Sequence, residues 1–382
     1  MTPDRAPDNG RFFELDILRG VASLLVVAFH YVHFYHTDQF QPDLYINVPF
    51  FDLLRPIYSH GQWFVELFFT ISGYVFFWLY RAPIMAGAVS FRTFVIARLA
   101  RLYPLYIATL ILTAGLMIIF HGLYGYDYVY QANTVGNFAL SALMVQQWWV
   151  GAVQSFNGPV WSISVEMGLY GLFFLFCTLK LGRRWLWVIV ALTTPLMWLW
   201  PEVAFFRGLP SFFLGGIAYF VARELSGVGV PIRKGILGVV AAGWVAAYLF
   251  GHDGLMNGEV IAVFSREVMV LGLMPLTLVA VDLWRGVIPA VRLKPFVWLG
   301  DISYSTYLIH FPLQLLIMIG LNGLAPATKV AVIASPLFFM AFFAALIGLS
   351  IVSYGQFEMT ARLYLLRRFL PRYRQQSASP KV

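Results

Sequence analysis

The sequence predicts an all-α protein that crosses a membrane about ten times. Of its 382 residues, 60% are hydrophobic and only 12% carry a charged side chain. The mean hydropathy of +0.75 is higher than a soluble globular domain needs, because such a domain keeps a polar surface. The basic residues lie in short clusters between the apolar runs, which is the pattern of membrane topology. The net charge of +8 therefore does not indicate a nucleic-acid partner.

Ten apolar segments are expected to form membrane-spanning helices. They cover residues 15–36, 62–80, 102–121, 160–179, 185–200, 208–224, 235–251, 259–281, 303–321 and 330–353. If the N-terminus is cytoplasmic, 22 of the 26 Lys and Arg residues fall on the cytoplasmic side. Because cytoplasmic loops carry the excess of basic residues, we expect both termini in the cytoplasm.

The chain divides into three parts. Residues 1–14 are expected to form a cytoplasmic segment, residues 15–355 a transmembrane domain, and residues 356–382 a basic cytoplasmic tail that meets anionic lipid headgroups. The first twelve residues lack the apolar core and the cleavage site of a signal peptide, so the first span is expected to act as an uncleaved anchor.

Residues 134–150 are apolar enough to suggest an eleventh span, but a crossing there would place the later basic clusters outside. We therefore predict a short helix on the outer face, capped by Asn133 or Thr134. Gln146, Gln147, Trp148 and Trp149 follow this helix. Interfacial anchoring and a place in the wall of a glycan-binding mouth both explain them.

The first span carries two ionisable residues, Arg19 and His30, in an otherwise apolar run. Such residues are costly at membrane depth and often mark functional sites. Eleven residues turn a helix about 20° past three full turns and lengthen it by about 16 Å. The two side chains therefore share a face, with Arg19 near the cytoplasmic surface and His30 in the outer half. A snorkelling arginine and a histidine satisfied by a neighbouring helix would explain the same pair.

Two acidic residues are expected at a depth similar to that of His30. Glu66 lies about one turn below the outer end of the second span, and Glu166 lies in the outer half of the fourth span, four residues after Ser162. A shared polar cavity would remove the cost of placing these groups in the membrane. There a carboxylate could bind one imidazole nitrogen while the other removes a proton from a hydroxyl. A structural polar knot between helices is the alternative.

Two arginines precede the third span. Arg98 and Arg101 are three residues apart on one helical face, and Tyr103 and Pro104 follow them. Paired guanidinium groups at a membrane mouth suit a phosphate-bearing cofactor, because each planar fork binds two oxygens. The positive-inside signal alone would also explain this cluster.

Three further features bear on the site. The ninth span carries a polar stripe of Ser303, Tyr307 and His310, which could line the cavity or pack between helices. The Ser-Gly-Tyr sequence at residues 72–74 could simply permit close helix packing. Cys177 is the single cysteine, so an intrachain disulfide and a cysteine-based metal site are excluded, and no metal site is expected.

Five motifs, taken in order, resemble the integral-membrane acyltransferase-3 family. They are Arg19 with ten residues before His30, Ser72-Gly73-Tyr74, Arg98-Leu-Ala-Arg101 with Tyr103-Pro104, the run from Trp161 to Glu166, and the run from Tyr304 to Pro312. The resemblance covers nearly the whole chain, from about residue 12 to residue 365.

The resemblance implies a multi-pass, membrane-bound O-acyltransferase of the bacterial cytoplasmic (inner) membrane. Members of this family move an acyl group, often acetyl from acetyl-CoA, onto hydroxyls of extracytoplasmic carbohydrates, a polysaccharide modification by O-acetylation. It implies that His30 is the catalytic residue and that Arg19, Arg98 and Arg101 contact the acyl donor.

The expected site combines the reasoning from residues with this resemblance. The catalytic group comprises His30, Glu166 and Glu66. The expected donor-binding residues are Arg19, Arg98, Arg101 and Tyr103. The expected substrate-binding or supporting residues are Ser72, Gly73, Tyr74, Trp161, Ser162, Ser164, Tyr307 and His310.

Acetyl-CoA or another acyl-CoA is thus the expected co-substrate, docked from the cytoplasm with its flexible arm reaching about 16 Å toward His30. His30 would act as a general base or form an acyl-imidazole, and both mechanisms stay open. The expected partners are a carbohydrate or glycan acceptor, membrane lipid and glycan-assembly proteins.

Two other classes of function would explain parts of the sequence. A proton-coupled transporter or flippase of a glycan or lipid-linked intermediate could also use buried ionisable residues, but the sequence shows no inverted repeat and no paired broken helices. A lipid-binding or partner-binding membrane scaffold would explain the composition. It gives no reason for Arg19 and His30 to share a face.

Overall fold

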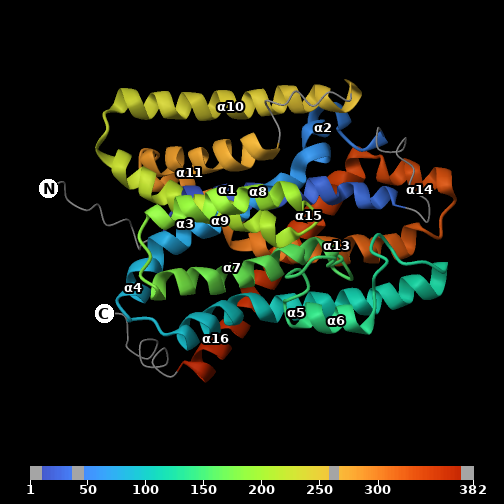
Figure 1. Ribbon diagram of the computed structural model, residues 1–382. Helices are drawn as coiled ribbons and strands as arrows, with labels where there is room; N and C mark the ends of the chain where they lie inside the picture. The colour runs from blue at the N-terminus through green and yellow to red at the C-terminus, as the bar shows by residue number, and fades with distance from the viewer. Residues whose placement is uncertain (1–10, 37–46, 258–265, 371–382) are drawn as a thin grey trace.

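The computed structural model describes residues 11–36, 47–257 and 266–370. Within these ranges the chain consists of helices joined by turns and loops, with no strand, which confirms the all-α prediction. Figure 1 shows most of the long helices running in roughly the same direction, as a bundle.

The bundle contains nine longer α-helices and seven shorter ones within the described ranges. The longer ones are α1 (Phe13–His30), α3 (Phe64–Leu79), α5 (Phe91–Tyr124), α7 (Trp161–Thr178), α8 (Arg184–Leu199), α9 (Ala204–Glu224), α10 (Val230–Asn257), α13 (Trp298–Leu321) and α15 (Pro336–Val352). The shorter ones are α2 (Phe51–His60), α4 (Arg81–Met85), α6 (Val135–Ala142), α11 (Met274–Leu283), α12 (Ala290–Leu293), α14 (Pro326–Ile333) and α16 (Met359–Phe369).

Eight helical segments of the described chain are long and apolar enough to cross a membrane. Two shorter apolar helices, Arg184–Leu199 and Val268–Leu283, fall on the fifth and eighth predicted spans. Part of the eighth predicted span, 259–265, lies outside the described residues. The chain is therefore a multi-pass membrane protein, while the count of ten crossings and the cytoplasmic termini stay predictions.

Two helices extend well beyond the predicted spans. α5 begins at Phe91, where the side chain of Ser90 accepts a hydrogen bond of 3.2 Å from the amide of Thr93. Its first turns carry arginines, which form helices readily but lower the local hydropathy. At the other end of the chain, α15 continues through a π-helical segment, Ser353–Glu358, into α16. Residues 356–369 of the predicted tail are therefore helical.

The prediction for residues 134–150 is confirmed in its local structure. α6 is a short helix, and the side chain of Thr134 caps it by accepting a hydrogen bond from the amide of Asn137. Trp148 is about half exposed, and its indole N–H donates to the carbonyl of Ser164 at 2.7 Å. This hydrogen bond links the loop after α6 to α7.

Glycines let the central helices approach until their backbones touch. A Cβ at Gly73 on α3 would lie 1.8 Å from the carbonyl oxygen of Phe212 on α9. A Cβ at Gly20 on α1 would lie 2.5 Å from Leu299, and one at Gly300 on α13 would lie 2.4 Å from the carbonyl of Asp16. Gly73 therefore serves the close packing that residues 72–74 suggested.

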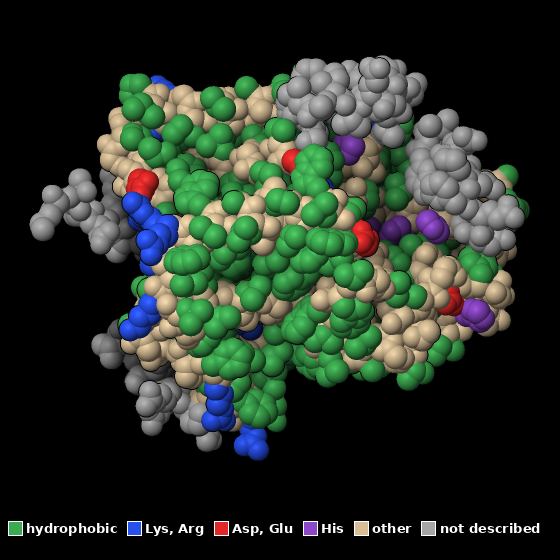
Figure 2. Space-filling view, in the orientation of Figure 1, with side chains coloured by type: hydrophobic (Ala, Val, Ile, Leu, Met, Phe, Trp, Pro, Cys, Tyr) green, Lys and Arg blue, Asp and Glu red, His purple; other side chains and the backbone are tan. Residues whose placement is uncertain are grey.

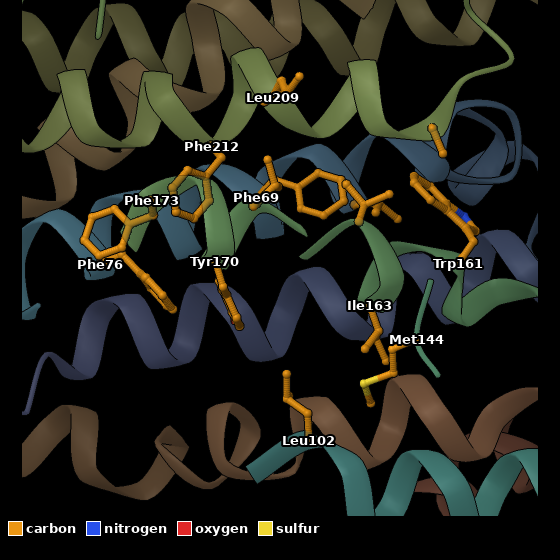
Figure 3. Packing of buried hydrophobic residues seen from close by; sticks show 14 of the residues in the cluster. Phe69, Phe76, Leu102, Met144, Trp161, Ile163, Tyr170, Phe173, Leu209 and Phe212 are labelled. Carbon is orange, nitrogen blue, oxygen red and sulfur yellow. The ribbon is translucent and has the colours of Figure 1, made fainter. Parts of the chain in front are cut away.

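Aromatic side chains fill the space between α3, α7 and α9. The rings of Phe76 and Phe173 lie 5.2 Å apart, and each lies within 6.1 Å of Phe212. Figure 3 shows this group, with Trp161 at the other end of the same buried cluster. Such edge-on rings bury a large apolar area and fix the orientation of the three helices.

The bundle has two chemically different ends. On the face drawn in Figure 2, most visible Lys and Arg side chains lie at the left, and the histidines lie at the right. We call the end with Arg11, Arg19 and Arg101 the arginine end. The opposite end of α1, with His30 and His33, is the histidine end. The predicted topology places the arginine end in the cytoplasm.

Candidate active site

Two adjoining cavities open at the arginine end. The first has a volume of about 330 Å³, and its charged lining includes Arg11, Arg19, Arg101 and Arg362. The second, of about 180 Å³, shares Arg19, Arg101 and Tyr304 with the first. Because they have walls in common, the two cavities are neighbours at the arginine end of the bundle.

α13 holds Arg19 in place. The Nη2 of Arg19 donates to the carbonyl of Gly300 at 2.6 Å, and its Nε donates to the hydroxyl of Ser303 at 3.0 Å. A carboxylate oxygen of Asp16 lies 3.5 Å from the guanidinium group. The glycine contacts between α1 and α13 make these bonds possible, since they bring the carbonyl of Gly300 within reach. Arg19 therefore lines the cavity in one fixed orientation.

Arg98 and Arg101 both line the second cavity, as their shared helical face predicted. Arg98 is buried, donates to the hydroxyl of Tyr80 at 2.6 Å, and places its guanidinium carbon 5.2 Å from the centre of the Phe76 ring. Arg101 is exposed. The two cations thus differ in role: Arg98 is packed against aromatic rings, and Arg101 faces the open mouth.

Glu166 lies in the second cavity with Ser162, on the same face of α7. The Oε1 of Glu166 accepts hydrogen bonds from the hydroxyls of Ser72, at 2.9 Å, and Tyr170. The sequence analysis allowed a carboxylate to accept a hydrogen bond from the imidazole of His30, but Glu166 does not, and it accepts instead from hydroxyl groups on α3 and α7. Glu166 and Ser72 do join one site, as the motifs suggested.

Glu66 is also engaged elsewhere. Its side chain is fully buried, and its Oε1 accepts from the Nε and Nη2 of Arg207, at 2.8 and 2.7 Å. The guanidinium carbon of Arg207 lies 4.8 Å from the centre of the Trp161 ring. Glu66 therefore forms an ion pair with α9 instead of the predicted bond to the imidazole. The sequence analysis missed Arg207, although a single arginine in an apolar run on the predicted outer side was a signal.

His30 belongs to a group of imidazoles. Its ring stacks on His310 of α13, with centroids 5.0 Å apart and planes 24° apart, and lies 4.9 Å from the ring of His33. His310 Nδ1 contacts the carbonyl of Tyr307 at 2.7 Å, so this nitrogen carries the proton. In the described part of the chain, Nδ1 of His30 and Nε2 of His310 receive no hydrogen bond.

Gln314 contacts two members of this group, His30 and His33. Gln314 Nε2 donates to the backbone carbonyl of His30 at 2.8 Å, while its Oε1 lies 3.4 Å from Nδ1 of His33. His36, beyond the span, packs edge-on against His33, and burial lowers the pKa of His36, which keeps it neutral near pH 7. The sequence analysis missed His33 and Gln314. Their spacing of three from His30 and four from His310 could have indicated both.

The polar stripe of α13 connects the second cavity to the imidazoles. Tyr307 lines this cavity, where its hydroxyl binds Ser162 at 2.9 Å and donates to the carbonyl of Pro159. Its ring lies 5.9 Å from that of His310. Ser303 lies at the arginine end of the same helix. The stripe therefore runs from Arg19 to the histidines, while His30 and His310 themselves lie outside the described lining of the two cavities.

Three other predicted site residues, Tyr103, Ser164 and Tyr74, pack against or bind neighbouring protein groups. Tyr103 is half-buried against the core, outside the described lining of the two cavities. The hydroxyl of Ser164 accepts from the amide of Gln147 at 3.1 Å. Tyr74 is buried, with its ring 6.4 Å from that of Phe12. A functional role for these three stays a prediction.

Within the described residues, no group of three or more His, Cys, Asp or Glu side chains is placed so that it could hold a metal ion. Cys177 is a buried thiol in the aromatic core.

Comparison with known proteins gives two results. A family model described as an acyltransferase domain, acyltransferase-3, matches residues 12–355. A curated protein of Rhizobium radiobacter, "Protein 2 in picA locus", is 35% identical over 108 residues, which are 28% of this chain and 47% of that protein. The chain thus matches about half the length of this relative. No solved structure matches the chain.

Proposed function

Because the chain belongs to the acyltransferase-3 family of membrane proteins, matched over residues 12–355, we propose that it transfers acetyl from acetyl-CoA to a carbohydrate hydroxyl. In this proposal the acceptor is extracytoplasmic, and the protein lies in the bacterial cytoplasmic membrane. The observation that supports it is the arrangement along α1 and α13, where arginine-lined cavities lie at one end and a stacked pair of imidazoles lies toward the other. Tyr307, which lines the second cavity, packs against His310 of that pair.

The arginine end fits an acyl-CoA. Charge-assisted hydrogen bonds from guanidinium forks suit phosphate groups, and Arg19 and Arg101 line both cavities. Deeper in the second cavity the walls include apolar side chains such as Phe68 and Leu102, which suit an uncharged thioester arm. When bound, acetyl-CoA supplies an activated carbonyl carbon.

The histidine end suits the acceptor. In this proposal one nitrogen of the His30 ring, which is 7% exposed, takes a proton from an acceptor hydroxyl. The acceptor oxygen then bonds to the acyl carbon as the carbon–sulfur bond breaks, and the proton passes to the leaving thiolate. Attack by the imidazole itself, followed by transfer, uses the same geometry.

Mass spectrometry of surface glycans from cells with and without the protein tests this function. We expect acetyl mass increments of carbohydrate only when the protein is present, and consumption of acetyl-CoA by the purified protein. A flippase or transporter would consume no acetyl-CoA. If correctly inserted protein neither adds acetyl groups to glycans nor consumes acetyl-CoA, the proposal is refuted.

Substitution of Arg101 with alanine is expected to raise the KM for acetyl-CoA about 10-fold, the loss of one charge-assisted contact, with little change in kcat. Arg101 is exposed at the cavity mouth, so its removal should leave the fold intact. Arg92→Ala is the matched control, since Arg92 is exposed on the same helix and lies outside the cavity lining. Equal KM values for the two variants would contradict a donor-binding role.

A further inference from the structure

A small polar pocket lies beside the chain that joins α6 to α7, separate from the arginine-lined cavities. Gln146, Ser155 and Asn157 line it and are exposed by only 8%, 7% and 2%. Its volume is about 10 Å³, room for roughly one water-sized group. Gln154 lines the same pocket and is exposed, so the pocket reaches the surface.

Neighbouring groups fix the orientation of both amides. Asn157 Nδ2 binds the carbonyl of Leu308 at 3.0 Å, and a carbonyl can only accept. Gln146 Nε2 binds the hydroxyl of Tyr106 at 3.0 Å, while that hydroxyl donates its proton to the carbonyl of Ser141 at 2.9 Å. Tyr106 can therefore only accept from Gln146. Both amides must present their nitrogens to the protein, which leaves their oxygens for the pocket.

Three buried oxygens thus share one pocket without a protein partner. Within the described residues, Gln146 Oε1, Asn157 Oδ1 and Ser155 Oγ have no hydrogen bond. A buried polar atom left unpaired costs about 1–3 kcal/mol, so such a cluster favours an occupant. Amide oxygens accept only. The occupant must therefore donate hydrogen bonds or be a cation, which excludes phosphate and carboxylate groups. A hydroxyl meets this requirement.

The position of the pocket links it to the histidine end. Asn157 is bound to the carbonyl of Leu308, two residues before His310 on α13, and His310 stacks on His30. Trp161, which lines the pocket, carries the guanidinium of Arg207 over its ring. Through Asn157 the pocket therefore borders the segment of α13 that carries His310.

We propose that this pocket binds a non-reacting hydroxyl of a polyhydroxylated acceptor and so selects the carbohydrate that reaches His30. This inference rests on the proposed function and adds a specificity site to it. The acceptor hydroxyl donates to an amide oxygen and can accept from Ser155 in return. A site built from buried acceptors rejects analogues that lack the hydroxyl, because its oxygens are then left unpaired.

Ser155→Ala provides the test, since the Ser155 hydroxyl has no hydrogen bond to the described protein that could be lost. The probe is the surface-glycan fraction of cells that lack the protein, titrated against purified enzyme and acetyl-CoA. We expect the glycan concentration at half-maximal transfer to rise about 10-fold. The rate of acetyl-CoA hydrolysis in the absence of glycan and the Tm should both stay unchanged. Ser59→Ala is the control, because this half-buried serine on α2 donates to the carbonyl of Arg55 outside the pocket.

Three results would overturn the proposal. Unchanged half-saturation in Ser155→Ala would mean that the pocket holds only water. A parallel loss of transfer, hydrolysis and Tm would mean a structural role. Loss of wild-type transfer when sodium is replaced by choline would mean a cation site. If wild-type protein consumes no acetyl-CoA at all, the proposed function itself fails, and this result is distinct from the other three.

Discussion

Replacement of His30 with alanine is expected to abolish glycan acetylation, with a fall in kcat of at least about 10³-fold. General base catalysis contributes roughly 10²–10⁴-fold, and loss of a nucleophile would cost more. His30 is 7% exposed and stacks on His310, so alanine removes the available nitrogen from the interior of the bundle. The measurements are the acetyl increment on surface glycans and acetyl-CoA turnover by purified protein.

The matched control is His121→Ala. This histidine lies near the end of α5, is exposed, and pairs with Asp127 at 2.8 Å. It should keep wild-type activity, and both variants should reach the membrane in equal amounts. Full activity of His30→Ala would rule out both proposed roles. An acetyl mass increment on the protein itself, trapped by acid quench during turnover, would favour the acyl-imidazole over direct transfer.

Replacement of Arg207 with methionine is expected to destabilise the protein by about 3–5 kcal/mol, because it leaves a fully buried carboxylate without its partner. Glu66 is 0% exposed, and both of its close contacts with Arg207 use the same oxygen. The measurement is thermal unfolding in detergent. The double variant Glu66→Gln, Arg207→Met should recover much of the loss, since no charge then stays buried.

The exposed pair of Arg183 and Glu224 supplies the control. Arg183→Met should change the stability by less than about 1 kcal/mol, because water already solvates both groups. A double variant as unstable as Arg207→Met alone would show that the arginine acts through its packing over Trp161 rather than through its charge.

Periodicity and local chemistry predicted much of this molecule. Runs of apolar residues located the helices, and the cap at Thr134 followed from the sequence preference of helix starts. The spacing of Arg98 and Arg101 predicted that both face one cavity. Each of these features depends on residues within a few positions of one another, and the geometry of a single helix determines them.

The partners of the buried carboxylates could not be predicted in the same way. Glu66 meets Arg207, which is 141 positions away in sequence, and Glu166 meets Ser72, which is 94 positions away. Equal depth in the membrane gave no information on which helices are neighbours. The close packing of Gly73 against the backbone of Phe212 makes α3 and α9 neighbours.

The contacts between α1 and α13 restrict where residues can be inserted or deleted. Arg19 and Ser303 meet at one end, His30 and Gln314 meet at the other, and eleven positions separate the pair on each helix. The two contacts are therefore separated by the same length of helix on α1 and on α13. An insertion or deletion in one would rotate its far end by about 100° per residue and break the match, so length changes should be tolerated only in the loops.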